Sequence, residues 1–244
     1  YDVLTALEKI GYITDLPLDE DSGIATIEKD HAISIQTNDL DFQFPDSQKK
    51  VLNELSLNIP ANAKAVITGV TGSGKTTLLR LLAGIYKQQG GEILINNIAL
   101  ENYNQNSFYE NIGIIFPSNQ IFEGTLKENI TMGKTISDKK IAEIIHLLGI
   151  DTYLRTQTKG IESLVDSGGR RLPRSIMQKI IIARVIINEP KLLLLEDPLQ
   201  FVSDDEKVQI IDYLTSSERN WTLVVVADYH YWSERATHQF ELKK

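Results

Sequence analysis

The residues best suited to chemistry stand between Gly69 and Thr77. This run fits the phosphate-binding pattern G-x-x-x-x-G-K-[ST] at every fixed position. Its glycines let successive backbone N–H groups point at a phosphate, and a helix start adds partial positive charge. In such a loop Lys75 reaches the β- and γ-phosphates, and the Thr76 hydroxyl ligates Mg²⁺. The predicted cofactor-binding residues here are Gly69, Thr71, Gly72, Ser73, Gly74, Lys75, Thr76 and Thr77.

The elements around this loop are those that the pattern requires. Residues 65–68 form an apolar run that predicts a buried strand, and residues 76–86 have the apolar spacing of a helix. An accidental match in a glycine-rich turn is the alternative. The strand before the loop and the helix after it favour the phosphate-binding interpretation.

The rest of the chain alternates strands with helices. Strands are predicted at residues 32–36, 40–44, 51–59, 92–95, 112–116, 192–195 and 223–227, and helices at 2–10, 138–148, 175–187 and 204–214. Such alternation implies a largely parallel core sheet. The first two strands alternate polar and apolar residues, which indicates a separate antiparallel part. Residues 15–23 are polar and acidic and are predicted to be a linker.

Composition narrows the class of protein further. The chain has 244 residues, of which 42% are hydrophobic and 24% charged, as in one large α/β domain or two small ones. No apolar run approaches the roughly 18 residues of a membrane span. The absence of cysteine excludes disulfides and thiolate metal sites. A formal charge of −8 disfavours a nucleic-acid partner, and with it a DNA-linked P-loop ATPase.

Several segments give the chain a resemblance to the nucleotide-binding domain of an ABC transporter, over almost its whole length. They are the strand 192–195 followed by Glu196-Asp197-Pro198, the runs Ile182-Ala183-Arg184 and Asn188-Glu189-Pro190-Lys191, and residues 122–130, which read F-x-G-T-L-x-E-N-I. The resemblance implies an α/β P-loop NTPase fold of ABC type. In that fold, this chain would have a mostly parallel core sheet, an antiparallel β-subdomain and a helical subdomain at roughly 118–175. The domain would span residues 31–244, and residues 1–30 resemble the link from the last membrane helix of an exporter.

The resemblance also implies ATP and Mg²⁺ as cofactors and gives individual residues a role. Phe44 stands where the family places the aromatic ring that stacks on adenine, although a phenylalanine of a core strand is the alternative. Glu196 would help to hold Mg²⁺ together with Thr76, and Asp197 would orient the attacking water. Both Glu196 and Asp197 are therefore the expected catalytic carboxylates. The family order is Asp then Glu, so the two side-chain lengths are exchanged here.

Two further family positions carry unusual residues. The glutamine that usually contacts Mg²⁺ and water aligns with Pro117, and Gln120 is close but displaced. The switch histidine aligns with Asp228, with His230 two residues later. A surface histidine is the favoured interpretation of His230.

The signature segment L-S-G-G-Q aligns with residues 172–176, and it is altered. Pro173 has neither a hydroxyl nor an N–H to offer a phosphate. The similar run at residues 167–169 lies six residues too early and is predicted to be an unrelated loop. Arginines at 170, 171 and 174 could replace neutral donors near a phosphate. A solvated basic loop is the alternative for each of them.

Two functions follow from this pattern. The first is an ATPase that powers export and is slow because of its altered motifs. The resemblance is to an exporter-type half-transporter, of the kind that secretes bacterial toxins or peptides. The second is a module that binds ATP and dimerises with little hydrolysis. The expected partners are a transmembrane domain of the same transporter and a second nucleotide-binding domain. Since the altered groups act on both ATP sites of a pair, a homodimer is favoured. The expected location is the cytoplasmic face of the membrane.

Overall fold

A five-stranded parallel sheet forms the centre of the computed structural model, which describes residue 5 and residues 23–243. Its order is β11-β3-β10-β9-β6, and each neighbouring pair is parallel. The strands are β3 (Lys64–Gly69), β6 (Ile112–Ile115), β9 (Leu192–Glu196), β10 (Thr222–Val226) and β11 (His238–Leu242). Every residue of β9 and β10 is buried, as expected for central strands covered on both faces.

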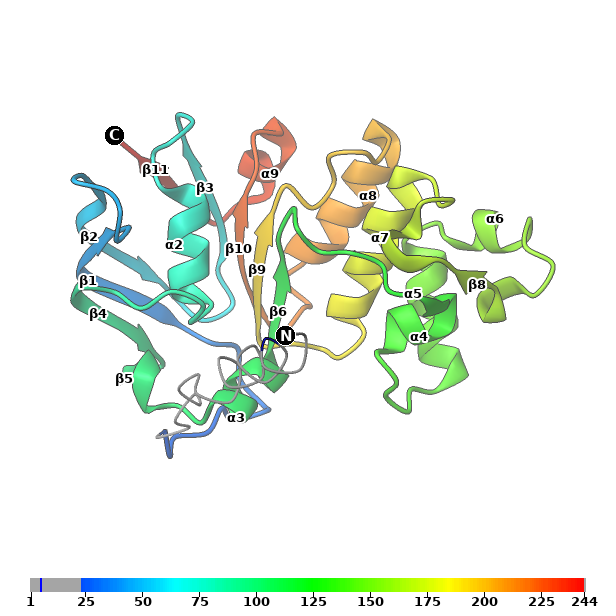
Figure 1. Ribbon diagram of the computed structural model, residues 1–244, viewed down its shortest axis with the longest axis horizontal. Helices are drawn as coiled ribbons and strands as arrows, with labels where there is room; N and C mark the ends of the chain where they lie inside the picture. The colour runs from blue at the N-terminus through cyan, green and yellow to red at the C-terminus, as the bar shows by residue number, and fades with distance from the viewer. Residues whose placement is uncertain (1–4, 6–22, 244) are drawn as a thin grey trace.

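A second, antiparallel sheet lies on one side of the parallel one. Its order is β2-β1-β4-β5, with β1 (Ile35–Gln43), β2 (Lys50–Ile59), β4 (Gly90–Ile95) and β5 (Ile98–Ala99). Helix α2 (Lys75–Leu82) lies between the two sheets (Figure 1). Its leucines pack in one buried cluster with residues of both sheets, including Ile35 of β1 and Leu194 of β9. The helix that follows the phosphate loop is therefore held from both sides.

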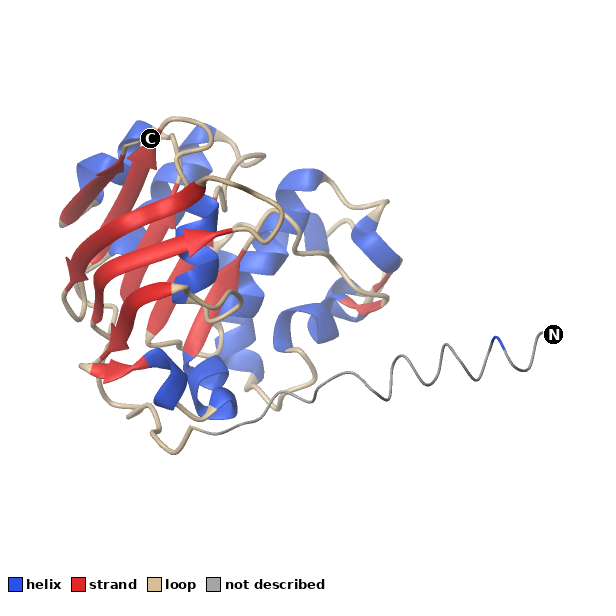
Figure 2. Ribbon diagram, turned by 60° about the vertical axis from the view of Figure 1, so that its left-hand side comes forward, coloured by secondary structure: helices blue, strands red, loops and turns tan. Residues whose placement is uncertain are grey.

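The remaining helices cover the other side of the parallel sheet and extend away from it. They are α4 (Leu126–Thr131), α5 (Asp138–Leu147), α6 (Asp151–Leu154), α7 (Arg174–Ile186), α8 (Asp204–Thr215) and α9 (His230–Arg235), whereas α3 (Gln105–Asn111) packs in the cluster that contains α2. Figure 2 shows most strands on one side of the molecule and the helix-rich part, with the short pair β7 (Gly124–Thr125) and β8 (Leu164–Val165), on the other. Short 3-10 turns are η1 (Leu100–Asn102), η2 (Gly160–Glu162) and η3 (Ser167–Gly169).

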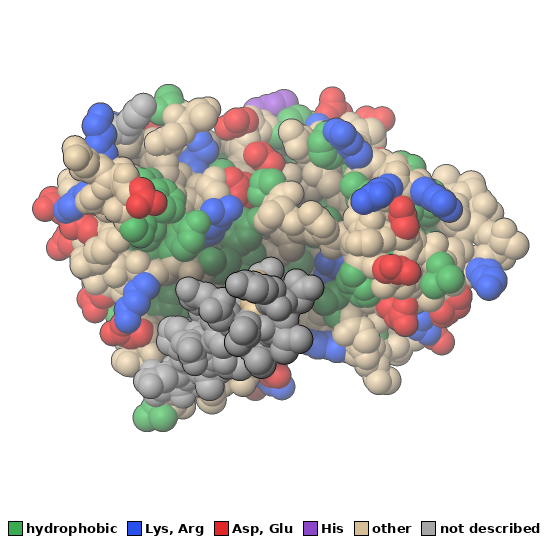
Figure 3. Space-filling model, viewed as in Figure 1, with side chains coloured by type: hydrophobic (Ala, Val, Ile, Leu, Met, Phe, Trp, Pro, Cys, Tyr) green, Lys and Arg blue, Asp and Glu red, His purple; other side chains and the backbone are tan. Residues whose placement is uncertain are grey.

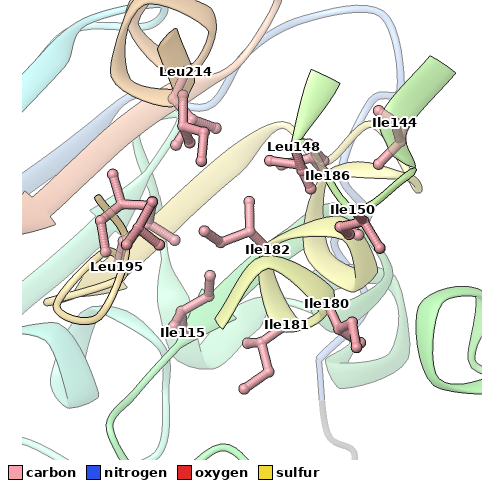
Figure 4. Close-up of a cluster of buried hydrophobic side chains, with 14 of the residues drawn as sticks. Ile115, Ile144, Leu148, Ile150, Ile180, Ile181, Ile182, Ile186, Leu195 and Leu214 are labelled. Carbon is pink, nitrogen blue, oxygen red and sulfur yellow. The ribbon is translucent and has the colours of Figure 1, made fainter. Parts of the chain in front are cut away.

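The isoleucines of α7 join the helix-rich part to the sheet. Ile180, Ile182 and Ile186 are almost fully buried, and they belong to one cluster with Leu195 of β9 and Ile144 of α5. Figure 4 shows these side chains converging from different elements. Because α7 packs on both the helix-rich part and the parallel sheet, its first turn is held close to the edge of that sheet.

The fold predicted from the sequence is confirmed: a parallel core sheet, an antiparallel sheet and a helical part are all present. Two expectations were wrong in detail. The strands expected at 32–36 and 40–44 form the single strand β1, which bulges where Asp39 adopts a φ of 46° and its N–H donates to Ser56 Oγ. The helix expected to reach residue 86 ends at Leu82, because Gly84 takes the left-handed conformation. The predicted helix at 2–10 and nearly all of the predicted linker at 15–23 lie outside the described residues.

Thr125 and Asn129 have structural roles in residues 122–130, the segment that reads F-x-G-T-L-x-E-N-I. The Thr125 side chain caps α4, and Glu128 completes a reciprocal capping box. Asn129 is fully buried and exchanges hydrogen bonds with the backbone of Phe122. Arg184 of α7 donates to the carbonyls of Asn129 and Gln120. This segment therefore fastens the loop after β6 onto α7.

Lys64 begins β3 with only 2% of its surface exposed. Its Nζ donates to the carbonyl oxygens of Trp221 at 2.5 Å and Arg219 at 3.3 Å. Burial lowers the pKa of Lys64 from its ordinary value of 10.5 to about 8. The folded protein should therefore become more stable as the pH rises and Lys64 loses its proton.

Between pH 8 and pH 10.5, the free energy of unfolding of the parent is expected to rise with pH. Lys64→Met is expected to remove the part of this rise that Lys64 contributes. In this window the unfolded chain still holds the proton that the folded chain has released, so raising the pH favours the folded state. The full shift corresponds to about 3 kcal/mol. Denaturant unfolding of both proteins at several pH values measures the difference. Parallel curves for the two proteins would contradict the buried, easily deprotonated lysine.

Candidate functional site

The predicted phosphate loop is a backbone cradle between β3 and α2. Gly72 and Gly74 have φ values of 80° and 93°, which a residue with a side chain rarely adopts. A Cβ atom on Gly74 would come within 2.8 Å of the Leu52 side chain and 3.1 Å of the Val51 carbonyl oxygen, so the surroundings are tight as well as the conformation unusual. The loop therefore has the shape that lets backbone N–H groups surround a phosphate.

Lys75 lies across this loop at the first position of α2. Its Nζ donates to the carbonyl oxygens of Gly69 at 2.5 Å and Val70 at 3.2 Å. The ammonium group thus stands over the cradle, where a bound phosphate could replace these carbonyls as its partner. Ser73 Oγ is buried and makes no hydrogen bond within the described structure. Thr71 is exposed at the loop and Thr77 is buried beneath it.

Thr76 and Glu196 meet across the site. The Thr76 hydroxyl donates to Glu196 Oε1, which joins the start of α2 to the end of β9. Glu196 is only 9% exposed, and its other oxygen, Oε2, is buried without a hydrogen-bond partner. A buried carboxylate oxygen without a partner beside a hydroxyl is suited to a divalent cation, because hard cations prefer oxygen ligands. The two residues expected to hold Mg²⁺ are therefore in contact.

Asp197 follows Glu196 at the edge of the sheet, in a left-handed conformation with a φ of 42°. Desolvation raises the pKa of Asp197, and the negative charges of Asp228 and Glu196 raise it further, while Lys75 lowers it. The effect of Lys75 means that its ammonium group lies within electrostatic reach of Asp197, which is exposed to solvent. A carboxylate there can accept a proton or orient a water molecule.

Phe44 lies just beyond β1 and is not a core residue, since 37% of it is exposed. Its ring packs edge-on against Phe42, with centroids 5.0 Å apart, and against Tyr86 at 5.8 Å. Phe42 pairs with Leu52, the residue that touches Gly74, so this aromatic group borders the phosphate loop. Part of the Phe44 side chain is therefore open to contact beside this loop.

Phe44→Ala is expected to weaken ATP binding several-fold, because stacking on a base contributes about 1–3 kcal/mol. Phe44→Tyr is the matched control, since it keeps the ring, and it should bind nearly as well as the parent. Titration with a fluorescent ATP analogue measures both affinities. If the tyrosine variant binds as poorly as the alanine variant, stacking is not the role of Phe44.

A cavity of about 350 Å³ opens beside the carboxylates. Its lining includes Pro117, Asn119, Arg174, Gln178, Glu196 and Asp197. Gln120 does not line this cavity. It is exposed, and its carbonyl accepts a hydrogen bond from Arg184. The polar side chain that the loop after β6 contributes here is Asn119, which the sequence analysis did not single out.

The start of α7 is the altered signature segment. Pro173 is the N-cap, and it makes no side-chain hydrogen bond there. Arg170, Arg171 and Arg174 are all exposed. The glycine run of η3 precedes this helix start, with the Gly168 N–H donating to the Ile121 carbonyl at 2.8 Å and the Gly169 carbonyl accepting from the Leu172 N–H at 2.9 Å.

The expected switch position holds Asp228, and its charge acts on Asp197 as described above. His230 begins α9 and not a loop, and its Nε2 lies 3.9 Å from Glu234 of the same helix. Its side chain is largely exposed. The charge of Asp228 therefore acts on Asp197, whereas the His230 ring lies beside Glu234 of its own helix.

The ABC transporter family model matches residues 52–200, well over half of the chain. The chain belongs to the ABC transporter family. A putative export ATP-binding/permease protein of Rickettsia prowazekii is 31% identical over 225 residues, which cover 91% of this chain and 39% of that protein. The glutathione/L-cysteine transport system ATP-binding/permease protein CydC of Haemophilus influenzae is 29% identical over 227 residues, which cover 92% of this chain and 39% of that protein.

A solved structure shares the fold of this ABC domain. It is a bacterial Atm1-family ABC exporter with ATP bound, with a TM-score of 0.87, 20% identity, and coverage of 98% of this chain and 42% of that chain. The chain spans 39% of the length of these curated relatives. Among residue 5 and residues 23–243, no helix is long and apolar enough to cross a membrane.

Proposed function

We propose that this ABC domain binds Mg-ATP and hydrolyses it slowly, to power export through membrane segments of the same transporter. The contact between Thr76 and Glu196 carries the proposal, because it joins the phosphate loop to the carboxylate strand. When bound, Mg²⁺ would supply positive charge to the phosphates and order the ligands around it. Thr76 and Glu196 would hold the ion, and Phe44 would stack on the adenine.

Asp197 is the proposed water-orienting group. It lies at the mouth of the site, next to Glu196 and under the influence of the Lys75 charge. Its raised pKa makes this carboxylate a stronger base than an ordinary aspartate, which suits a group that accepts a proton from water. Asn119 lines the same cavity; its Oδ1 accepts from the Phe116 N–H, so its Nδ2 could donate to the water or the γ-phosphate where the family uses glutamine.

An ATP-binding module with little hydrolysis is the second candidate. It is favoured by Pro173, which offers no donor at the start of α7, and by Asp228, which adds negative charge beside Asp197. Both changes would reduce the stabilisation of negative charge on the γ-phosphate while it is transferred to water and ADP leaves. The P-loop supports the two candidates equally, so turnover and not binding separates them.

The proposed partners are a transmembrane domain and a second copy of this chain, at the cytoplasmic face of the membrane. The fusion architecture of the relatives supports the first partner. A homodimer follows from altered groups that would affect both ATP sites of a pair. On the face in Figure 3, acidic and basic side chains are interspersed. The net charge of −8 disfavours a nucleic-acid partner.

ATP turnover by the full-length protein in its membrane tests the proposal. Release of phosphate that requires Mg²⁺ and is lost in Glu196→Gln supports hydrolysis at this site. Tight Mg-ATP binding without turnover would favour the second candidate. The membrane segments are kept because they hold two copies together.

A further inference from the structure

Two side chains on one face of α7 contact the loop that follows Asp197. The Arg174 guanidinium lies 5.0 Å from the centroid of the Phe201 ring. Gln178 Oε1 accepts a hydrogen bond from the Phe201 backbone N–H at 2.7 Å. Because residues four apart lie on the same side of a helix, the two contacts act together on Phe201.

The loop from Pro198 to Ser203 is anchored at each end by other elements. At its start, the Asp197 N–H donates to the Val226 carbonyl of β10 at 2.9 Å. At its end, Ser203 is the N-cap of α8. Phe201 lies between these ends and is 43% exposed, so burial alone does not hold it. Its contacts with α7 therefore restrain the middle of the loop.

These contacts lie beside the catalytic carboxylates. Arg174, Gln178 and Phe201 line the cavity of about 350 Å³ that Glu196 and Asp197 also line. Asp197 has a left-handed backbone with a φ of 42°, so the direction of its carboxylate depends on how the following loop is held. A shift of Phe201 would therefore be passed along four residues to Asp197.

We propose that Arg174 is a positioning residue for Asp197 of its own chain, acting through Phe201. The arginine at an altered signature position thus works within its own subunit, on the loop of the hydrolytic carboxylate. Its charge is used in the stack on Phe201, and Gln178 fixes the backbone of the same residue. This inference rests on the proposed ATPase function.

The kinetic test compares Arg174→Ala, Phe201→Ala and the double variant in the full-length protein in its membrane. Each single change should lower kcat about tenfold with KM for ATP unchanged, since a small displacement of a catalytic group is costly. The double variant should be no slower than either single variant, because each single change already removes the same contact between Arg174 and the Phe201 ring. Phe201→Tyr keeps the ring and should retain the parent kcat. Arg155→Ala, an exposed arginine on α6's C-terminal side, controls for loss of charge.

Multiplicative losses in the double variant, or a parent-like kcat in Arg174→Ala, would overturn the proposal. If Arg174 instead serves the partner's ATP, its removal should weaken ATP-driven dimerisation to the same extent with or without Phe201. That result would also overturn the proposal. If Arg174→Ala does not fold, Arg174→Gln replaces it in the same cycle, with the same expected result, because it also removes the guanidinium that lies over the Phe201 ring.

Amide hydrogen exchange of residues 198–203 gives a readout that does not need turnover. Arg174→Ala should speed exchange of the Phe201 amide, because the loop loses one of its restraints, while Arg155→Ala should not. Unchanged exchange would overturn the positioning role. If the parent has no turnover, the proposed ATPase function fails, and exchange alone decides whether Arg174 holds the loop.

Discussion

Lys75→Ala is expected to lower the affinity for Mg-ATP by about a hundredfold or more. A hydrogen bond to a charged group contributes about 1.5–3 kcal/mol, and Lys75 can offer such bonds to two phosphates. Its Nζ already lies over the loop, within hydrogen-bond distance of Gly69 and Val70 carbonyls. Alanine leaves the loop glycines and α2 unchanged, so the loss should fall on binding and not on folding.

Isothermal titration of the parent and the variant with Mg-ATP measures this effect. Lys159→Ala is the matched control, because it removes the same charge from an exposed residue of the helical part. The control should bind as the parent does. Equal binding by Lys75→Ala and the parent would refute the assignment of residues 69–77 as the phosphate site.

The exchanged carboxylates should prove to be adapted to each other. Glu196 already uses its length to reach the Thr76 hydroxyl, so Glu196→Asp should withdraw the contact by about 1 Å and cost on the order of 100-fold in turnover. Asp197 has a left-handed backbone, which aspartate tolerates better than most residues with side chains. Asp197→Glu alone should therefore leave turnover unchanged or lower it.

The double variant, which restores the usual family order, should be faster than the product of the single effects predicts. Adjacent groups that share one ion couple strongly, so non-additivity of about tenfold or more is expected. Phosphate release by all four full-length proteins in membranes, at saturating Mg-ATP, completes the cycle. Additive effects would refute adaptation, and a gain from Asp197→Glu alone would mean that the exchange is a simple defect.

Local patterns were reliable where neighbouring residues determine the structure. The phosphate loop needs glycines at positions with positive φ and a lysine at a helix start, and both requirements are written in consecutive residues. The buried strands β9 and β10 were equally clear, because uninterrupted apolar runs of that length suit central parallel strands. The single strand β1 was missed because its bulge at Asp39 depends on Ser56 of another strand.

Longer-range features were not predictable from single segments. Strand β11 was not predicted, and its polar, half-exposed sequence becomes a strand because it pairs along β3. Asn119 carries no distinctive pattern, yet the loop after β6 brings it to the carboxylate cavity. The displaced Gln120 was the candidate by sequence distance, but its side chain is not among those that line the cavity.

The sequence by itself determined the fold class and the phosphate-loop motif, because these depend on consecutive residues and on hydrophobic periodicity, whereas Glu196 and Asp197 were expected as catalytic carboxylates only through the resemblance to the ABC family. Only the tertiary structure decided which oxygen of Glu196 has a partner, that the charge of Asp228 raises the pKa of Asp197, and that Arg174 lies on Phe201. These contacts join residues up to 120 positions apart, as between Thr76 and Glu196. Such pairs form only when α2, α7 and the ends of β9 and β10 pack at one edge of the parallel sheet, and packing is a property of the whole chain.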